Sequence, residues 1–148
     1  MPIPPELFTN VYAIATEGKL AELDHARFED FVVQTVNGDT PMRHIAFGAR
    51  LDEEKDGAIV YLLTNRRLIK ITINPPEFKS SATFVSQIVG GVNRKIISRQ
   101  AEKLPDLIWI TINFPQGSFG LKYSTEDHEI TNFFQEVDSV IGQLVVPR

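Results

Sequence analysis

The chain has 148 residues, contains no cysteine and carries a formal net charge of −4 at pH 7. This length is typical of one domain with a buried core, and the lack of cysteine excludes disulfides, thiolate metal sites and cysteine nucleophiles. No basic region followed by an apolar run opens the sequence, and no apolar stretch approaches the ~20 residues that span a bilayer. We therefore expect a cytoplasmic protein without a signal peptide or transmembrane segment.

Charge is unevenly distributed along the chain. Residues 1–57 carry 11 acidic and 5 basic side chains, whereas residues 58–103 carry 2 acidic and 8 basic ones. Residues 104–148 are acidic again, with 6 acidic and 2 basic side chains. Segments of opposite charge can cover one another within a fold or between subunits. A basic face can instead meet a polyanion such as lipid headgroups or nucleic acid.

The N-terminal forty residues have a helical pattern. Residues 4–6 (Pro-Pro-Glu) are typical of a helix start, and apolar residues then recur on one face. A second, less regular helical segment follows, and residues 31–36 are either its tail or a short strand. The Asn-Gly-Asp sequence at 37–39 predicts a loop. We place a boundary there, between a helical segment at 1–40 and a domain at 41–148.

The remainder of the chain is dominated by the alternation typical of β-strands. On both sides of Thr64-Asn65-Arg66 the side chains fall on two alternate faces and are rich in β-branched residues, which predicts a hairpin over 58–73. We expect Asn65 to suit the turn because its short side chain tolerates the left-handed conformation. Residues 90–93 (Gly-Gly-Val-Asn) predict another turn. The expected strands are 45–51, 58–63, 68–73, 83–89, 94–99, 107–114 and 118–123.

A long amphipathic helix is expected after the last strand. Residues 124–127 (Ser-Thr-Glu-Asp) resemble a capping box, with Ser124 capping the helix and Asp127 reaching back. Apolar residues recur at helical spacing from Ile130 to Leu144, which predicts a helix over 125–145. Such a helix would be about 30 Å long. That length is enough to cover one open end of a small barrel.

Seven strands followed by one amphipathic helix is the element order of a pleckstrin-homology domain. The T-x-R-R-L hairpin of bacterial pleckstrin-homology-like domains is similar to residues 62–71 (LLTNRRLIKI). Their last strand and capping helix resemble residues 117–137 (GSFGLKYSTEDHEITNFFQEV). The resemblance covers roughly residues 43–148. It implies a mainly β fold, a seven-stranded barrel or orthogonal sandwich capped by a C-terminal helix and preceded by a helical segment.

The resemblance also implies a non-enzymatic fold used for binding and, in bacterial members, commonly for homo-oligomer assembly. In lipid-binding members, basic residues cluster in the first strand-loop-strand unit. Only Arg50 and Lys70 stand where the family would place phosphate ligands. The loop at 52–56 has four acids and one base, so a phosphate would meet net negative charge there. This sequence therefore departs from the pattern of the headgroup site.

Seven basic residues are candidate binding residues. Arg66 and Arg67 at the hairpin turn either contact an anionic partner through their guanidinium groups or keep an exposed turn soluble. Arg94 and Lys95 are adjacent on one predicted strand, so we expect their side chains on opposite faces. The full set is Arg50, Arg66, Arg67, Lys70, Arg94, Lys95 and Arg99.

No motif in the sequence indicates an active site. The three histidines, His25, His44 and His128, are far apart and lack ligand spacing. The common zinc-protease, serine-hydrolase and phosphate-loop motifs are absent. We therefore expect no catalytic residue, no metal and no cofactor. Six aromatic residues are interpreted as the junction of the last strands and the terminal helix: Trp109, Phe114, Phe119, Tyr123, Phe133 and Phe134.

These observations together predict a non-enzymatic binding or assembly module that self-associates or binds another protein, and nothing in them indicates a nucleic-acid partner. Two alternatives stay open. The basic segment 58–103 could bind an anionic membrane surface peripherally. A small α+β enzyme or ligand carrier, with helices packed on a curved sheet, would also fit the leading helices.

Overall fold

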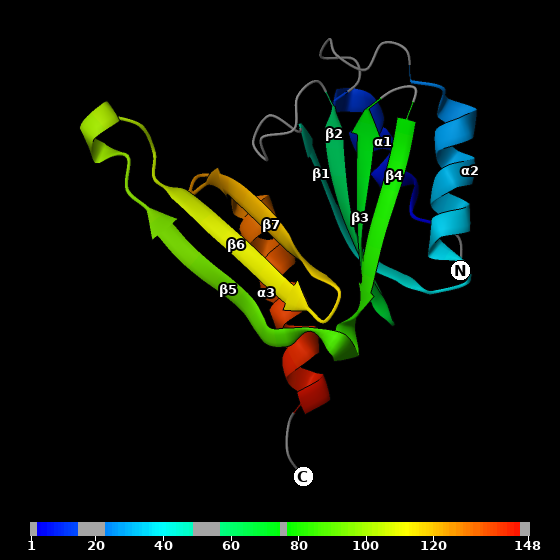
Figure 1. Cartoon of the computed structure of the whole chain (residues 1–148). Helices are drawn as coiled ribbons and strands as arrows, with labels where there is room; N and C mark the ends of the chain where they lie inside the picture. Colours follow the sequence, from blue (N-terminus) through cyan, green and yellow to red (C-terminus); the bar gives the residue numbers. More distant parts are fainter. Residues whose placement is uncertain (1–2, 15–22, 49–56, 75–76, 146–148) are drawn as a thin grey trace. The chain divides into compact units, whose positions relative to one another are not determined.

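The protein divides into two compact units, Met1–Ala82 and Thr83–Arg148. The computed structural model describes residues 3–14, 23–48, 57–74 and 77–145 (Figure 1). Within this described part the fold is mainly β, with seven strands in two antiparallel sheets and three α-helices. Each unit is built on one of the two sheets.

The first unit is a four-stranded sheet with the strand order β1-β2-β3-β4. Strand β2 pairs with β1 and β3, and all seven of its side chains are buried. The elements of this unit are α1 (Pro5–Ile14), α2 (His25–Val36), β1 (Pro41–Gly48), β2 (Ala58–Thr64), β3 (Arg67–Asn74) and β4 (Glu77–Phe84).

Helices α1 and α2 share one apolar core with this sheet. The side chain of Asp24 accepts a hydrogen bond from the Arg27 N–H at 3.1 Å and begins α2, and Asn37 ends it in the left-handed conformation. The core combines residues of both helices with alternate residues of β2 and β3: Leu7, Val11, Phe28, Val32, Val60, Leu62, Ile69 and Ile71. The predicted helical segment is therefore an integral part of the first unit.

The second unit is a three-stranded sheet, β5-β6-β7, with one long helix. Figure 1 shows α3 running along one face of this sheet. The elements of this unit are η3 (Val85–Gln87), β5 (Val89–Ile97), η4 (Gln100–Glu102), β6 (Leu107–Phe114), β7 (Gly117–Ser124) and α3 (His128–Val145).

Alternation in the three strands gives this sheet two different faces. The inner face, on which α3 lies, contains the buried side chains Val92, Ile110, Ile112, Phe119, Leu121 and Tyr123. Helix α3 contributes Ile130, Phe133, Phe134, Val137 and Ile141, which are also buried. The opposite side chains form what we call the outer face, and it is largely polar.

Two sequence-based expectations about architecture need correction. Among the described residues no strand pairing joins the two sheets, so they are not closed into a barrel, and α3 lies along a sheet face rather than across a barrel mouth. Residues 83–89 are not one strand, because β4 ends at Phe84 and a short 3-10 helix follows. The two compact units divide between Ala82 and Thr83, and the domain boundary expected after residue 40 stays a prediction.

The Gly90-Gly91 pair does not form a turn between strands. Both glycines have positive φ, 76° and 68°, and lie in β5 where the pairing with β6 shifts register between Val89 and Val92. Left-handed glycines serve β-bulges as readily as turns. The bulge directs the Val92 N–H to the Asp138 carboxylate at 3.1 Å and so connects β5 to α3.

The residue that caps α3 differs from the one that the sequence predicted. Asp127, not Ser124, caps the helix, because its carboxylate accepts the Ile130 N–H at 3.2 Å. The Ser124 hydroxyl instead accepts the Glu126 N–H at 3.1 Å in the preceding turn. The helix therefore starts at His128, three residues later than the sequence predicted.

The hairpin between β2 and β3 is confirmed, with Leu63 paired to Leu68. The expected left-handed Asn65 is wrong, since Asn37 and Lys103 are the non-glycine residues with positive φ among those described. Asn65 instead accepts a hydrogen bond from the Thr40 N–H through its side chain and donates its own N–H to the Thr40 carbonyl, both at 2.9 Å. Asn65 thus connects the hairpin turn to Thr40, in the loop that precedes β1.

Candidate functional site

The seven candidate basic residues do not gather in one place. Arg50 lies outside the described residues. Arg66, Arg67 and Lys70 belong to the β2–β3 hairpin of the first unit, whereas Arg94, Lys95 and Arg99 belong to β5 and the loop after it in the second unit. Most of those that the structure describes have intramolecular partners, so their surroundings decide which could meet a ligand.

Arg67 is a structural residue. Its Nε donates to the Asp39 carboxylate at 2.7 Å, and one terminal nitrogen donates to the carbonyls of Thr35 and Val36, both at 2.9 Å. These two carbonyls lie in the last turn of α2, which lacks intrahelical donors for them. The guanidinium therefore closes the end of α2 and connects it to the hairpin.

Asp39 is the buried centre of this network. The Thr64 hydroxyl donates to its carboxylate at 3.0 Å, and Arg66 approaches it at 3.7 Å from an exposed position. Burial raises the pKa of Asp39, but the hydrogen bonds from Arg67 and Thr64 and the charges of both arginines outweigh burial and hold this pKa below its usual value. The pair Arg66 and Arg67 thus serves the first unit internally.

Arg94 and Arg99 are also engaged within their own unit. Arg94 lies 3.5 Å from the Asp138 carboxylate of α3, on the inner face of the sheet. Arg99 donates to the Pro105 carbonyl at 2.7 Å, and its backbone N–H donates to the Asp106 side chain at 3.1 Å. Both arginines therefore stabilise the second unit, one by holding α3 and the other by closing the β5–β6 loop.

Lys95 is placed differently, because it lies on the outer face beside an exposed tryptophan. Trp109 is directly across from Lys95 on one side and from Lys122 on the other. The two Nζ atoms lie over the indole at 5.6 Å and 4.8 Å from its centroid. At these distances an ammonium is attracted by the ring quadrupole. We call these three residues the Lys–Trp–Lys row.

Trp109 as a whole residue is 38% exposed, which is unusual for a large aromatic in the middle strand of a sheet. Its Nε1 lies 3.8 Å from the position that a Cβ would take on Gly120, so the indole spreads over the place where Gly120 has no side chain. On one side its outer-face neighbours are polar, Asn93, Thr111, Asn113 and Ser118, whereas the paired Ile97 and Leu107 on the other side are apolar. The indole is the largest side chain of this face.

Charge separates the two layers of the second unit. The three strands contain Arg94, Lys95 and Lys122 and no acidic residue, whereas α3 contains Glu129, Glu136 and Asp138 and no lysine or arginine. Glu126 and Glu129 at the start of the helix are exposed, like Lys95 on the sheet. The helix layer is therefore acidic and the outer face of the sheet is basic.

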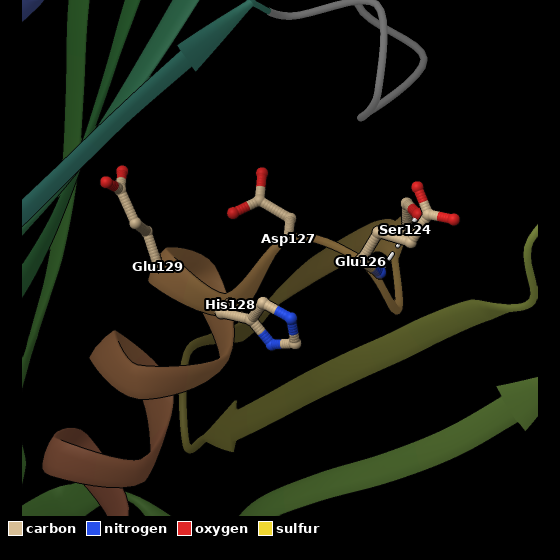
Figure 2. A pocket seen from close by; sticks show the side chains of 5 residues that line it. All are labelled: Ser124, Glu126, Asp127, His128 and Glu129. Atoms are coloured by element: carbon tan, nitrogen blue, oxygen red, sulfur yellow. Dashed lines mark hydrogen bonds between the residues drawn. The ribbon is translucent and has the colours of Figure 1, made fainter.

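An open depression lies at the start of α3, and its lining is acidic (Figure 2). The lining side chains are Ser124, Glu126, Asp127, His128 and Glu129. Figure 2 shows the three carboxylates pointing away from one another, so they do not converge on a common point. Within the described ranges no three side chains of metal-binding type form a ligand set. We assign this depression no metal or catalytic function.

The other two histidines belong to the first unit. His25 stacks on Tyr12 with ring centroids 3.8 Å apart, and the Tyr12 hydroxyl donates to Glu29, which together with burial raises the Tyr12 pKa. His44 lies within 3.4 Å of the Asn10 amide, between β1 and α1, and burial lowers its pKa although Glu6 opposes the shift. These contacts join the helices to each other and to the sheet.

Comparison with family models, with curated proteins and with solved structures gave no match for this chain. Among the described residues, none of the helices is both long enough and apolar enough to cross a bilayer.

Sequence reasoning missed Trp109 and Lys122 as surface residues. Trp109 was interpreted as part of the aromatic junction, which is wrong, whereas Phe119, Tyr123, Phe133 and Phe134 are buried as predicted. The signal was present in the strand pattern. Ile110 and Ile112 are inward, so position 109 shares the outward parity of Thr111 and Asn113.

Proposed function

We propose that this chain is a non-enzymatic assembly module that associates with further copies of itself through the two layers of its second unit. The observation that supports the proposal is the charge separation between the basic outer face and the acidic α3 layer. Complementary charge steers association and fixes its orientation. The earlier interpretation of a self-associating or protein-binding module thus gains a specific pair of surfaces.

The two surfaces cannot satisfy each other within one unit. Helix α3 lies on the inner face of the sheet, and the Lys–Trp–Lys row points away from that face. The acidic helix of one copy can therefore meet the basic sheet of another copy, which gives a head-to-tail contact. Head-to-tail contacts produce rings if the rotation closes and filaments if it does not.

The resemblance to pleckstrin-homology-like domains agrees with this proposal. The described elements follow the same order, seven strands and then one amphipathic helix. We propose that the chain is a member of this group with an open arrangement of its two sheets. Under this proposal the fold would serve binding rather than catalysis.

Charge reversal tests the proposed contact. One variant carries Lys95→Glu and Lys122→Glu, and the other carries Glu126→Lys and Glu129→Lys. The first variant presents acidic charge on both layers, and the second places basic charge at the start of α3 as well as on the sheet. We therefore expect each variant alone to sediment as a monomer. An equal mixture restores opposite charges at every junction and should recover the assembly seen for the unmodified chain. Sedimentation velocity at low salt measures all four samples.

A matched control changes two lysines elsewhere. The variant Lys79→Glu/Lys103→Glu alters the net charge by the same amount at exposed positions outside the Lys–Trp–Lys row. It should assemble as the unmodified chain does. An unmodified chain that stays monomeric at low salt and high concentration would refute self-assembly. An assembly that persists in both reversal variants would show that other surfaces carry it.

A further inference from the structure

The Lys–Trp–Lys row has the chemistry of a site for carboxylates. Lys95 and Lys122 each carry an ammonium with three donors and no acceptor, and the Trp109 indole adds a single N–H donor. No acidic side chain is present in the three strands that form the face. A carboxylate carried on an aliphatic stem would match both parts of this row, the ammonium groups and the exposed indole.

From this arrangement we infer that the row is a docking site for an acidic polypeptide segment, with two carboxylates held by the two lysines and aliphatic stems packed on the indole. The side chains of glutamate provide both parts, because two methylene groups precede each carboxylate. Residues of the row lie on three neighbouring strands about 4.8 Å apart. Lys95 and Lys122 therefore start from the strands on either side of Trp109, and both ammonium groups reach over its ring.

Charge and composition favour a polypeptide over a membrane surface. Each lysine near an anionic membrane contributes about 1 kcal/mol, and the outer face offers two lysines and one partly exposed ring. Its other side chains include polar Asn93 and Thr111 and apolar Ile97 and Leu107. Two lysines fall short of the roughly four to eight basic residues that are typical of clusters binding anionic lipid.

The same geometry argues against single-stranded nucleic acid. Recognition of bases without sequence preference uses free aromatic faces on which the bases stack. Here the ammonium groups of Lys95 and Lys122 already lie over the Trp109 ring. A base could stack only after displacing them, whereas a carboxylate can bind the ammonium groups where they are.

This inference deepens the proposed function, since the acidic α3 layer of a second copy is one segment of the required chemistry. Two results distinguish the docking site from self-assembly. A chain that binds acidic peptide but stays monomeric would support the docking site and refute self-assembly. A chain that assembles without any contribution of the Lys–Trp–Lys row would support self-assembly and refute the docking site.

Fluorescence of Trp109 gives a direct readout, because it is the single tryptophan of the chain. We would titrate the full chain at low salt with a poly-glutamate peptide and, separately, with a poly-glutamine peptide of equal length. The glutamate peptide should change the emission with a saturating curve, and the glutamine peptide should not. Raising the salt from ~0.1 M to ~1 M shortens the Debye length from ~10 Å to ~3 Å and should weaken binding at least about tenfold.

Substitutions locate the site without altering the fold. The variant Lys95→Gln/Lys122→Gln should lose the glutamate response, whereas Lys79→Gln/Lys103→Gln, which removes the same charge elsewhere, should keep it. Circular dichroism checks that both variants are folded. An unchanged response in the Lys95/Lys122 variant would overturn the inference.

Two further titrations separate the alternatives. Vesicles with a high content of anionic lipid and an oligothymidylate replace the peptide in the same assay. Saturating binding of either one, together with no response to poly-glutamate, would overturn the inference in favour of a membrane or nucleic-acid ligand. A response to poly-glutamate alone would support it.

Discussion

Arg67 and Arg66 are neighbours in one turn, yet their replacement by alanine should have very different consequences. The side chain of Arg67 is 20% exposed and lies 2.7 Å from the Asp39 carboxylate, whereas that of Arg66 is 61% exposed and 3.7 Å away. Asp39 itself is only 3% exposed. Removing Arg67 leaves this buried carboxylate without its closest positive partner and takes a donor from the carbonyls of Thr35 and Val36. The Val36 carbonyl still accepts the Asp39 N–H at 3.0 Å.

The magnitudes follow from this difference in burial. Breaking a buried ion pair by removing one partner costs 3–5 kcal/mol. We expect Arg67→Ala to lower the free energy of unfolding by about 3 kcal/mol, the lower end of that range, because Thr64 and Arg66 still contact Asp39. Exposed ion pairs contribute about 0–1 kcal/mol, so Arg66→Ala should cost about 0.5 kcal/mol. Urea unfolding followed by far-UV circular dichroism measures both values.

The pH dependence supplies a second, independent signature. In the unmodified chain the Asp39 pKa is lowered, so its contribution to stability is present above the usual pKa of about 3.9 and is lost as the pH falls through the lower folded value. Without Arg67, burial dominates and should raise this pKa. Acidification would then stabilise the variant relative to the unmodified chain. Equal losses in the two alanine variants, or an unchanged acid profile, would refute the network.

Three further predictions concern caps, the bulge and a histidine. Asp127→Ala should cost about 1 kcal/mol as the loss of a helix N-cap, and Ser124→Ala should cost less; equal costs in urea unfolding would contradict the assignment. Gly90→Ala should cost about 1–2 kcal/mol for its left-handed backbone. Gly91→Ala should cost more, since its Cβ would also lie 2.9 Å from a carboxylate oxygen, and similar losses would count against this close contact. Because burial lowers the His44 pKa, its contribution to stability should be present above about pH 6.5 and lost as the pH falls through the folded pKa; a His44→Gln variant with the same acid sensitivity would exclude this residue as the cause.

Local pattern was sufficient for the regular elements of the fold. The hairpin at 58–73 and the strands at 107–114 and 118–123 were predicted because alternation and β-branched residues act within a few positions. Gly90-Gly91 was misinterpreted because turns and bulges both require glycines with positive φ. Deciding between them depends on the pairing of β5 with β6, which the local sequence does not specify.

Contacts between residues far apart in the sequence could not be predicted from local pattern. Arg67 was expected to be either a partner-binding or a solubilising residue, but its partners Asp39 and the end of α2 lie about thirty residues earlier. Closure of the strands into a barrel was equally beyond local pattern, since it depends on which distant edges pair. The outward orientation of Trp109 could have been predicted, because it shares the strand parity of Thr111 and Asn113 in β6.

Zero-length cross-linking between isotopically distinct copies tests the central claim most directly. Chains of natural isotopic composition and chains uniformly labelled with ¹⁵N would be mixed and treated with a carbodiimide, which joins amines to carboxylates in direct contact. We predict mixed-isotope peptides that join Lys95 or Lys122 to Glu126 or Glu129. Cross-links confined to single chains, or mixed-isotope products that never include the two lysines, would contradict the proposed contact between the basic sheet and the acidic helix.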